Sequence, residues 1–139
     1  MYLSTGTLRY SPKLVANRSE KWWMIIDADP EIGRLYRNLY KNYFYSCKFL
    51  QRPSWKEHIT IIRDEEPPIA KQALWEKYQG KQIEFRYFPQ LRTNGLYFWL
   101  DVECEELFQL RTELGLSRDP EVPFHLTIGH TGESASQSF

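Results

Sequence analysis

Two histidines of the chain open the same four-residue pattern: His58 begins the run HITI, and His125 begins the run HLTI. In an extended strand, side chains two residues apart point to the same face. Each pattern therefore presents an imidazole beside a hydroxyl, from Thr60 or from Thr127. A histidine titrates near pH 6.5, at about neutrality, so one ring can serve as a base while its twin serves as an acid. Hydroxyls can stabilise charge on phosphate oxygens, and the pairs thus predict acid–base chemistry at a phosphodiester.

The alternative interpretation is that both histidines are hydrogen-bonded structural residues in or near the core. A metal site is not expected, because His125 and His130 are five residues apart and no third ligand is evident. His130 is followed directly by Thr131 and lies outside the pattern. Cys47 and Cys104 have no metal-like spacing and are interpreted as free thiols. No cofactor is predicted.

Apolar periodicity and turn residues predict the elements that hold these side chains. In the first half we expect two strands, a helix that Asp29, Pro30 and Glu31 begin, and a strand that His58 opens. In the second half we expect a hairpin, a helix that Gly115 ends, and a strand that includes His125. The expected strands are 3–10, 22–27, 58–62, 82–88, 96–102 and 124–128, with a weaker helix at 71–77.

The two halves thus have the same order of elements, which indicates an internal repeat. A shift of 75 residues aligns the helical stripe of Ile32, Leu35 and Leu39 with that of Leu107, Leu110 and Leu114. We predict one α+β domain over residues 1–139, built from duplicated ββαβ halves at about 1–66 and 82–130. Its antiparallel sheets would carry helices on their outer faces and both His-x-Thr motifs in a central cleft between two lobes. Residues 131–139 are expected to form a flexible tail.

Composition narrows the function classes. The chain has 139 residues with 18 Lys and Arg against 18 Asp and Glu, so the formal net charge is zero. Proteins that bind duplex DNA through charge alone are usually basic, and that class is disfavoured. No apolar run is long enough to cross a membrane, and the first residues do not resemble a secretion signal. We therefore expect a cytoplasmic protein with no membrane partner.

Aromatic residues are abundant, with five Trp, nine Tyr and eight Phe, and several adjoin a basic residue. Such side chains can stack on bases while the cations attract phosphate, although most are needed to fill a small core. Tyr10 beside Arg9 is the first candidate, and Trp55 and Lys56 precede the first motif. The predicted substrate-binding residues are Arg9, Tyr10, Trp55, Lys56, Trp75 and Phe139.

The paired His-x-Thr motifs and the repeat resemble the 2H phosphoesterase superfamily over roughly residues 1–130. That resemblance implies a metal-independent enzyme acting on RNA or small nucleotides, with His58, Thr60, His125 and Thr127 as the catalytic set. Within the superfamily, the segments STGTLRY, DADPEIGRLYRNLY and KYQGKQIEF resemble the phage anti-CBASS nucleases.

The narrower resemblance implies cleavage of cyclic di- and trinucleotide immune messengers inside a bacterial host. One histidine would deprotonate a ribose 2′-hydroxyl, which attacks the neighbouring 3′-phosphate, and the other would protonate the departing 5′-oxygen. Which histidine is the base stays open. Two alternatives also stay open: an enzyme acting on RNA 2′,3′-cyclic phosphates or 2′-5′ linkages, and a non-catalytic protein that sequesters nucleotides or binds RNA. The oligomeric state does not follow from the sequence.

Overall fold

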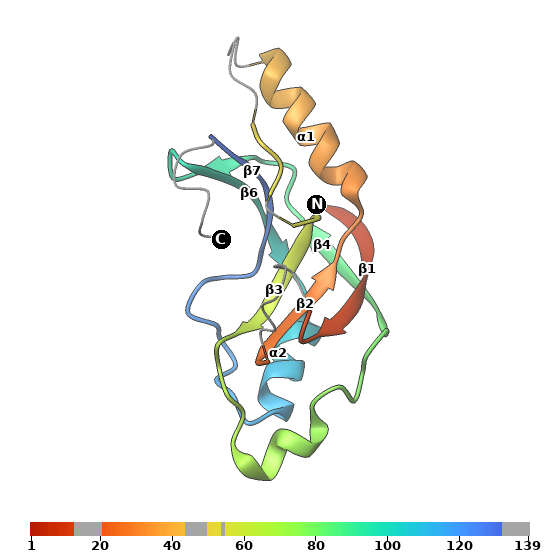
Figure 1. Cartoon of the computed structure of the whole chain (residues 1–139). Coiled ribbons are helices and arrows are strands. Elements are labelled where there is room, and N and C mark those ends of the chain that lie inside the picture. The colour runs from red at the N-terminus through yellow and green to blue at the C-terminus, as the bar shows by residue number, and fades with distance from the viewer. Residues whose placement is uncertain (13–20, 44–49, 54, 132–139) are drawn as a thin grey trace.

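The computed structural model describes residues 1–12, 21–43, 50–53 and 55–131. Within these ranges the chain forms a mixed α/β structure around an antiparallel sheet (Figure 1). The elements, in chain order, are β1 (Tyr2–Tyr10), β2 (Trp23–Asp27), α1 (Pro30–Tyr43), β3 (His58–Arg63), the 3-10 helix η1 (Ile69–Leu74), β4 (Gln82–Tyr87), β5 (Arg92–Thr93), β6 (Tyr97–Glu103), α2 (Glu105–Glu113) and β7 (His125–His130).

The sheet closes on itself. Its strand order is β4-β1-β2-β3-β7-β6-β5, and a further pairing joins β4 to β6. Six of the strands in the described residues therefore form a closed antiparallel barrel, from which β5 extends at the outer edge of β6. The sequence predicted separate sheets in two lobes. A single closed sheet results because β1 pairs with β4 and β3 pairs with β7.

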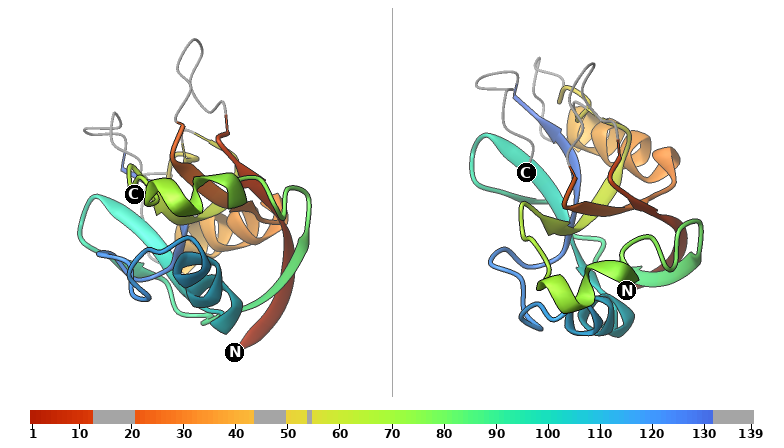
Figure 2. Two further views of the ribbon diagram at one scale, coloured as in Figure 1. Left: turned by 90° about the horizontal axis from the view of Figure 1, so that it is seen from below. Right: turned by 60° about the horizontal axis from the view of Figure 1, so that its bottom comes forward.

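The start of α1 and the end of α2 lie where the sequence predicts them. The Asp29 carboxylate accepts a hydrogen bond from the Glu31 backbone N–H at 2.9 Å, which caps the start of α1. Gly115 ends α2 with a φ of 76°, a left-handed conformation that favours glycine. Figure 1 shows α1 and α2 at opposite ends of the sheet, and the right view of Figure 2 agrees.

One core joins the sheet to both helices. Its fully buried side chains include Leu8, Ile26, Ile59, Leu100 and Leu126, and α2 contributes Leu107. The predicted apolar stripe of α1, formed by Ile32, Leu35 and Leu39, is only partly buried as expected. Ile32 is buried, but Leu35 is 52% exposed, because Tyr36 rather than Leu35 lies on the buried face of α1.

The segment between β3 and β4 differs from its prediction. The expected helix at 71–77 is the shorter η1, which begins and ends earlier. Lys77 and Tyr78, which follow η1, both bond the Glu113 carboxylate, so this segment packs beside α2 (Figure 2). None of the helices in the described ranges is long and apolar enough to cross a membrane.

Candidate active site

The two His-x-Thr motifs lie on adjacent antiparallel strands, β3 and β7. Ile59 is the cross-strand partner of Leu126, and both side chains are completely buried in the core. Their neighbours therefore point to the opposite face of the sheet. Continuing the antiparallel register by one residue in each direction brings His58 opposite Thr127 and Thr60 opposite His125. The fold thus gathers the four predicted catalytic residues on one face.

Each histidine ring is oriented by the same hydrogen bond. The His58 Nδ1 lies 2.8 Å from the carbonyl oxygen of Lys56, and the His125 Nδ1 lies 2.8 Å from that of Pro123. A carbonyl oxygen only accepts, so Nδ1–H is the donor in both cases. This assignment makes Nε2 the acceptor nitrogen of each neutral ring, and Nε2 is therefore the atom suited to proton transfer.

Burial disfavours the charged form of His58. The side chain is 5% exposed, and desolvation is the main cause that lowers the pKa of this imidazole below its usual value. The bond to the Lys56 carbonyl and the charge of Asp27 act in the opposite direction, and the charges of His125 and Arg63 lower the pKa further. Burial thus favours the neutral imidazole, which is the form that can accept a proton.

An aspartate faces each histidine across the neighbouring strand. Asp27 of β2 is the register partner of His58, and Asp101 of β6 is the partner of His125. Register partners share a face of the sheet, so each imidazole has a carboxylate beside it.

Each of these aspartates also forms an ion pair. Asp27 lies 2.6 Å from the Arg9 guanidinium, and Asp101 lies 2.8 Å from that of Arg92. The two arginines sit at corresponding places, since Arg9 pairs with Ile25 in register and Arg92 pairs with Trp99. Two cations therefore flank the candidate site at its outer sides.

Tryptophans pack edge-on against both histidines. The ring centroids of Trp23 and His58 are 6.3 Å apart, and those of Trp99 and His125 are 6.4 Å apart. Trp23 also forms a small apolar cluster with Ile25 and Trp55. The indole N–H of Trp99 donates to Asp101 at 3.2 Å. The aromatic rings confine the imidazoles and lower the local polarity around them.

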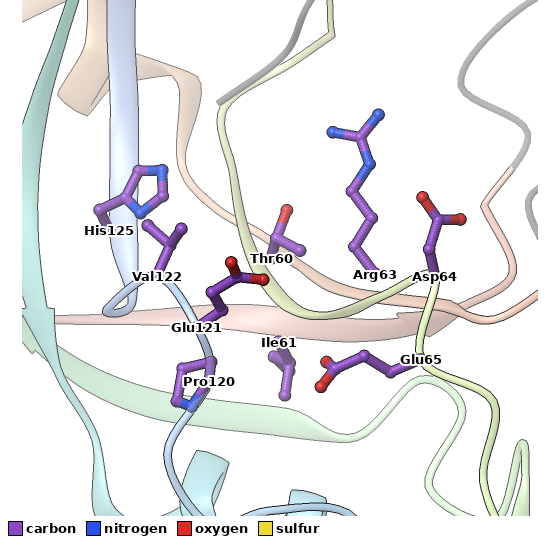
Figure 3. Close-up of a pocket in the computed structure, with 9 residues that line it drawn as sticks. All are labelled: Thr60, Ile61, Arg63, Asp64, Glu65, Pro120, Glu121, Val122 and His125. Carbon is purple, nitrogen blue, oxygen red and sulfur yellow. The ribbon is translucent and has the colours of Figure 1, made fainter.

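A cavity of about 580 Å³ opens beside Thr60 and His125. Figure 3 shows His125 on one side of it and Arg63 with Asp64 on the other. Its volume falls in the usual range for small-molecule sites. The other residues that line it are Ile61, Glu65, Pro120, Glu121 and Val122. A ligand there would thus meet a histidine, a hydroxyl, a guanidinium and carboxylates.

Three of the predicted substrate-binding residues lie near the histidine face. Trp55 is half-buried against Trp23 and Ile25. The exposed Lys56 supplies the carbonyl that holds His58, and Arg9 pairs with Asp27. Phe139 lies outside the described residues.

Tyr10 and Trp75 form a separate aromatic cluster. Their ring centroids are 4.9 Å apart in an edge-to-face arrangement, and the ring centroids of Trp22 and Trp75 are 5.0 Å apart. Tyr10 is 6% exposed and belongs to the core, and its burial raises the pKa of the phenol to about 12. The structure does not bring this pair onto the face that carries the histidines.

Sequence reasoning missed Asp27, Asp101 and Arg92. A signal was present in the matching runs WWMIID and FWLDV, each of which ends at or next to an aspartate. Among the described residues, no group of three or more His, Cys, Asp or Glu side chains could hold a metal ion. Comparison of the chain with family models, curated proteins and solved structures finds no match.

Proposed function

We propose that the protein is a metal-independent phosphodiesterase of the 2H type that cleaves cyclic di- and trinucleotides. The observation that carries the proposal is the repeated geometry of the two histidines. Each ring donates Nδ1–H to the carbonyl two residues before it, and the two rings lie on adjacent strands with a threonine beside each. Two like-oriented imidazoles on one face can act as a base and an acid on one substrate.

A duplication of ββαβ halves is part of this proposal, and the register supports it. The order β1-β2-α1-β3 is followed by β4-β6-α2-β7, with the short β5 added between β4 and β6. Asp27 opposes His58 in the first half as Asp101 opposes His125 in the second. The 74-residue offset between the aspartates exceeds the 67-residue offset between the histidines mainly because α1 has 14 residues and α2 has 9; the connection before β3 is also longer than that before β7.

In the proposed reaction, His58 is the base because burial lowers the pKa of its imidazole and favours the neutral form. Its Nε2 takes the proton of a ribose 2′-hydroxyl, and the 2′-oxygen attacks the phosphorus of the adjacent 3′-phosphate. The bond from phosphorus to the 5′-oxygen breaks as protonated His125 supplies a proton to that oxygen. The product is a linear nucleotide that ends in a 2′,3′-cyclic phosphate. Atoms and charge balance without a further reactant.

Two threonines and two arginines would stabilise the negative charge of the phosphate. The hydroxyls of Thr60 and Thr127 lie on the same face as the imidazoles and can donate to the non-bridging oxygens. Arg9 is 48% exposed and Arg92 is 58% exposed, so their guanidinium groups are accessible to an anionic substrate. In a bacterial host, such an activity would remove cyclic nucleotide messengers of anti-phage immunity, as the resemblance to phage anti-CBASS nucleases implies.

The test uses purified protein in EDTA with 3′,3′-cyclic GMP–AMP, cyclic triadenylate and an RNA that carries a 2′,3′-cyclic phosphate. Products are separated by chromatography for the wild type, His58→Ala and His125→Ala. Loss of either histidine should lower turnover of the cyclic substrate by about 10²- to 10⁴-fold. The matched control is His130→Ala, which removes the third histidine and should retain activity.

Three other results would contradict the proposed cleavage of cyclic nucleotides. Turnover of the RNA alone would replace the proposal with an RNA-end phosphodiesterase. Tight binding of the cyclic nucleotides without turnover would indicate a sequestering protein. Equal activity of the wild type and both histidine variants would exclude the acid–base role.

A further inference from the structure

The two strands that carry the histidines meet along a very short ladder. β2 is paired with β3 along its whole length, whereas the ladder between β3 and β7 consists of the pair Ile59 and Leu126. The relative position of His58 and His125 therefore depends on further contacts across this seam.

Arg37 of α1 bridges the seam from one end. Its side chain is 12% exposed, and Nη1 donates to the Glu57 carboxylate and to the Ile128 carbonyl, at 2.9 Å in each case. Glu57 directly precedes His58, and Ile128 is the third residue after His125. A single guanidinium nitrogen thus ties the start of one motif to the end of the other.

Arg111 of α2 makes a corresponding contact from the second half. Its side chain is 1% exposed, and Nη1 donates at 2.9 Å to the carbonyl of Ile61, the third residue after His58. Its two terminal nitrogens also bind the Glu65 carboxylate at 2.6 and 2.8 Å, and Nε donates to Ser117 at 2.9 Å. Ser117 lies in the connection that leads from α2 to β7.

Each of these two arginines joins the helix of one half to the motif of the other half. Arg37 and Arg111 are 74 residues apart, the same offset as Asp27 and Asp101. Each arginine comes from the helix of one half and holds the main chain of the other half's motif, at the third residue after its histidine. We propose that Arg37 and Arg111 are positioning residues that clamp this seam and so fix the spacing of the two histidines. Arg37 joins Glu57 to β7, and Arg111 joins β3 to the connection that leads to β7. As a role in catalysis, this rests on the proposed phosphodiesterase function.

The chemistry of the clamp explains why arginine stands there. Guanidinium presents several donors in a fixed plane, whereas an ammonium is a compact charge on a flexible stem. Replacing a buried ion pair with apolar residues often leaves a fold stable, so stability alone does not require these pairs. The backbone of α1 also packs directly on the Arg37 pair. A Cβ at Gly33 would collide with the Glu57 carboxylate and lie 2.7 Å from Arg37 Nη1.

The experiment compares Arg37→Met/Glu57→Met and Arg111→Lys with the wild type. The double change avoids leaving an unpaired carboxylate buried. The lysine of Arg111→Lys keeps the positive charge but lacks the planar set of guanidinium donors. Leu8→Ala is the control, because Leu8 is fully buried in β1, a strand that pairs with neither β3 nor β7. Amide hydrogen exchange is followed in peptides that cover 58–63 and 125–130, and steady-state kinetics use 3′,3′-cyclic GMP–AMP below the melting temperature of every variant.

We expect at least 10-fold faster exchange at the seam in the arginine variants but not in Leu8→Ala. We also expect kcat to fall at least 10-fold with KM within about 2-fold. Exchange no faster at the seam than in Leu8→Ala would overturn the clamp. Faster exchange with unchanged kcat would overturn its role in catalysis. A wild type that cleaves no substrate would instead reject the proposed function, and exchange alone would then decide whether the clamp exists.

Discussion

Asp27 is the cross-strand partner of His58, and the same carboxylate holds the Arg9 guanidinium at 2.6 Å. The charge of Asp27 raises the pKa of the imidazole and opposes the stronger effect of burial. A carboxylate on the neighbouring strand therefore limits how far burial lowers the pKa of His58. This relationship can be tested without a substrate.

Asp27→Asn should lower the pKa of His58 further, because it removes a nearby negative charge and frees the positive charge of Arg9. The measurement is an NMR titration of the His58 ring protons. Glu84→Gln, an equivalent loss of charge at an exposed position of β4, serves as the control. A midpoint that stays in place or rises in Asp27→Asn would contradict the assignment.

Stability should fall in mild acid because of His58. Its pKa is lower in the folded state than the unfolded value near about 6.5, so the unfolded chain binds the proton first as the pH drops. The stabilisation that His58 contributes is complete above that value and is lost as the pH falls through the folded pKa. Urea unfolding at pH 7.5 and 5.0 should therefore show a smaller loss for His58→Gln than for the wild type. An equal loss in both proteins would assign acid sensitivity to other groups.

Thr60→Val and Thr127→Val should each reduce kcat by about 100-fold, because each removes one donor to the developing phosphate charge. Binding should change little, since the volume and the strand conformation are preserved. Thr5→Val, at an exposed position of β1, is the matched control and should behave as the wild type. Kinetics with 3′,3′-cyclic GMP–AMP provide the measurement, and full activity in both motif variants would remove the hydroxyls from the mechanism.

Substitution of Trp55 should weaken substrate binding, whereas substitution of Trp75 should lower the stability of the fold. Trp55 packs beside Trp23 on the histidine face, so Trp55→Ala should raise the Kd for a cyclic dinucleotide by about 10-fold or more through a lost stacking surface. Trp75 contacts Tyr10 and the core, so Trp75→Ala should cost about 2–4 kcal/mol of unfolding free energy. Calorimetric binding and urea unfolding of both variants test this division. If Trp75→Ala lost affinity while keeping its stability, Trp75 would belong to the substrate site.

The local structure was predictable because its signals lie within a few residues. The cap at Asp29, the stop at Gly115 and the alternation around His58 and His125 all appear at the predicted places. Leu35 failed as a core residue because the position of a helix face against a sheet is a tertiary property. Periodicity gives a stripe, and the neighbours decide which edge of the stripe is buried.

The candidate site was predictable at its centre and not at its periphery. A repeated tetrapeptide is visible in the sequence, whereas Asp27 becomes a neighbour of His58 only through the register of β2 with β3. The closure of the sheet was missed for the same reason, since pairing of β1 with β4 joins segments about 80 residues apart. The basic neighbour of Tyr10 favours a stacking role, but strand alternation turns the Tyr10 ring toward the core.

β7 is the last strand along the described chain, yet it lies between β3 and β6. During synthesis, both of those strands present unpaired edges until residues 125–130 emerge, and an open apolar edge can pair with another chain. Insertion of β7 removes both edges and delivers the second histidine in the same event. We therefore expect a chain without residues 125–130 to expose both edges and to lack the histidine pair. The need for a chaperone should consequently end, and the proposed phosphodiesterase activity should begin, at the same chain length.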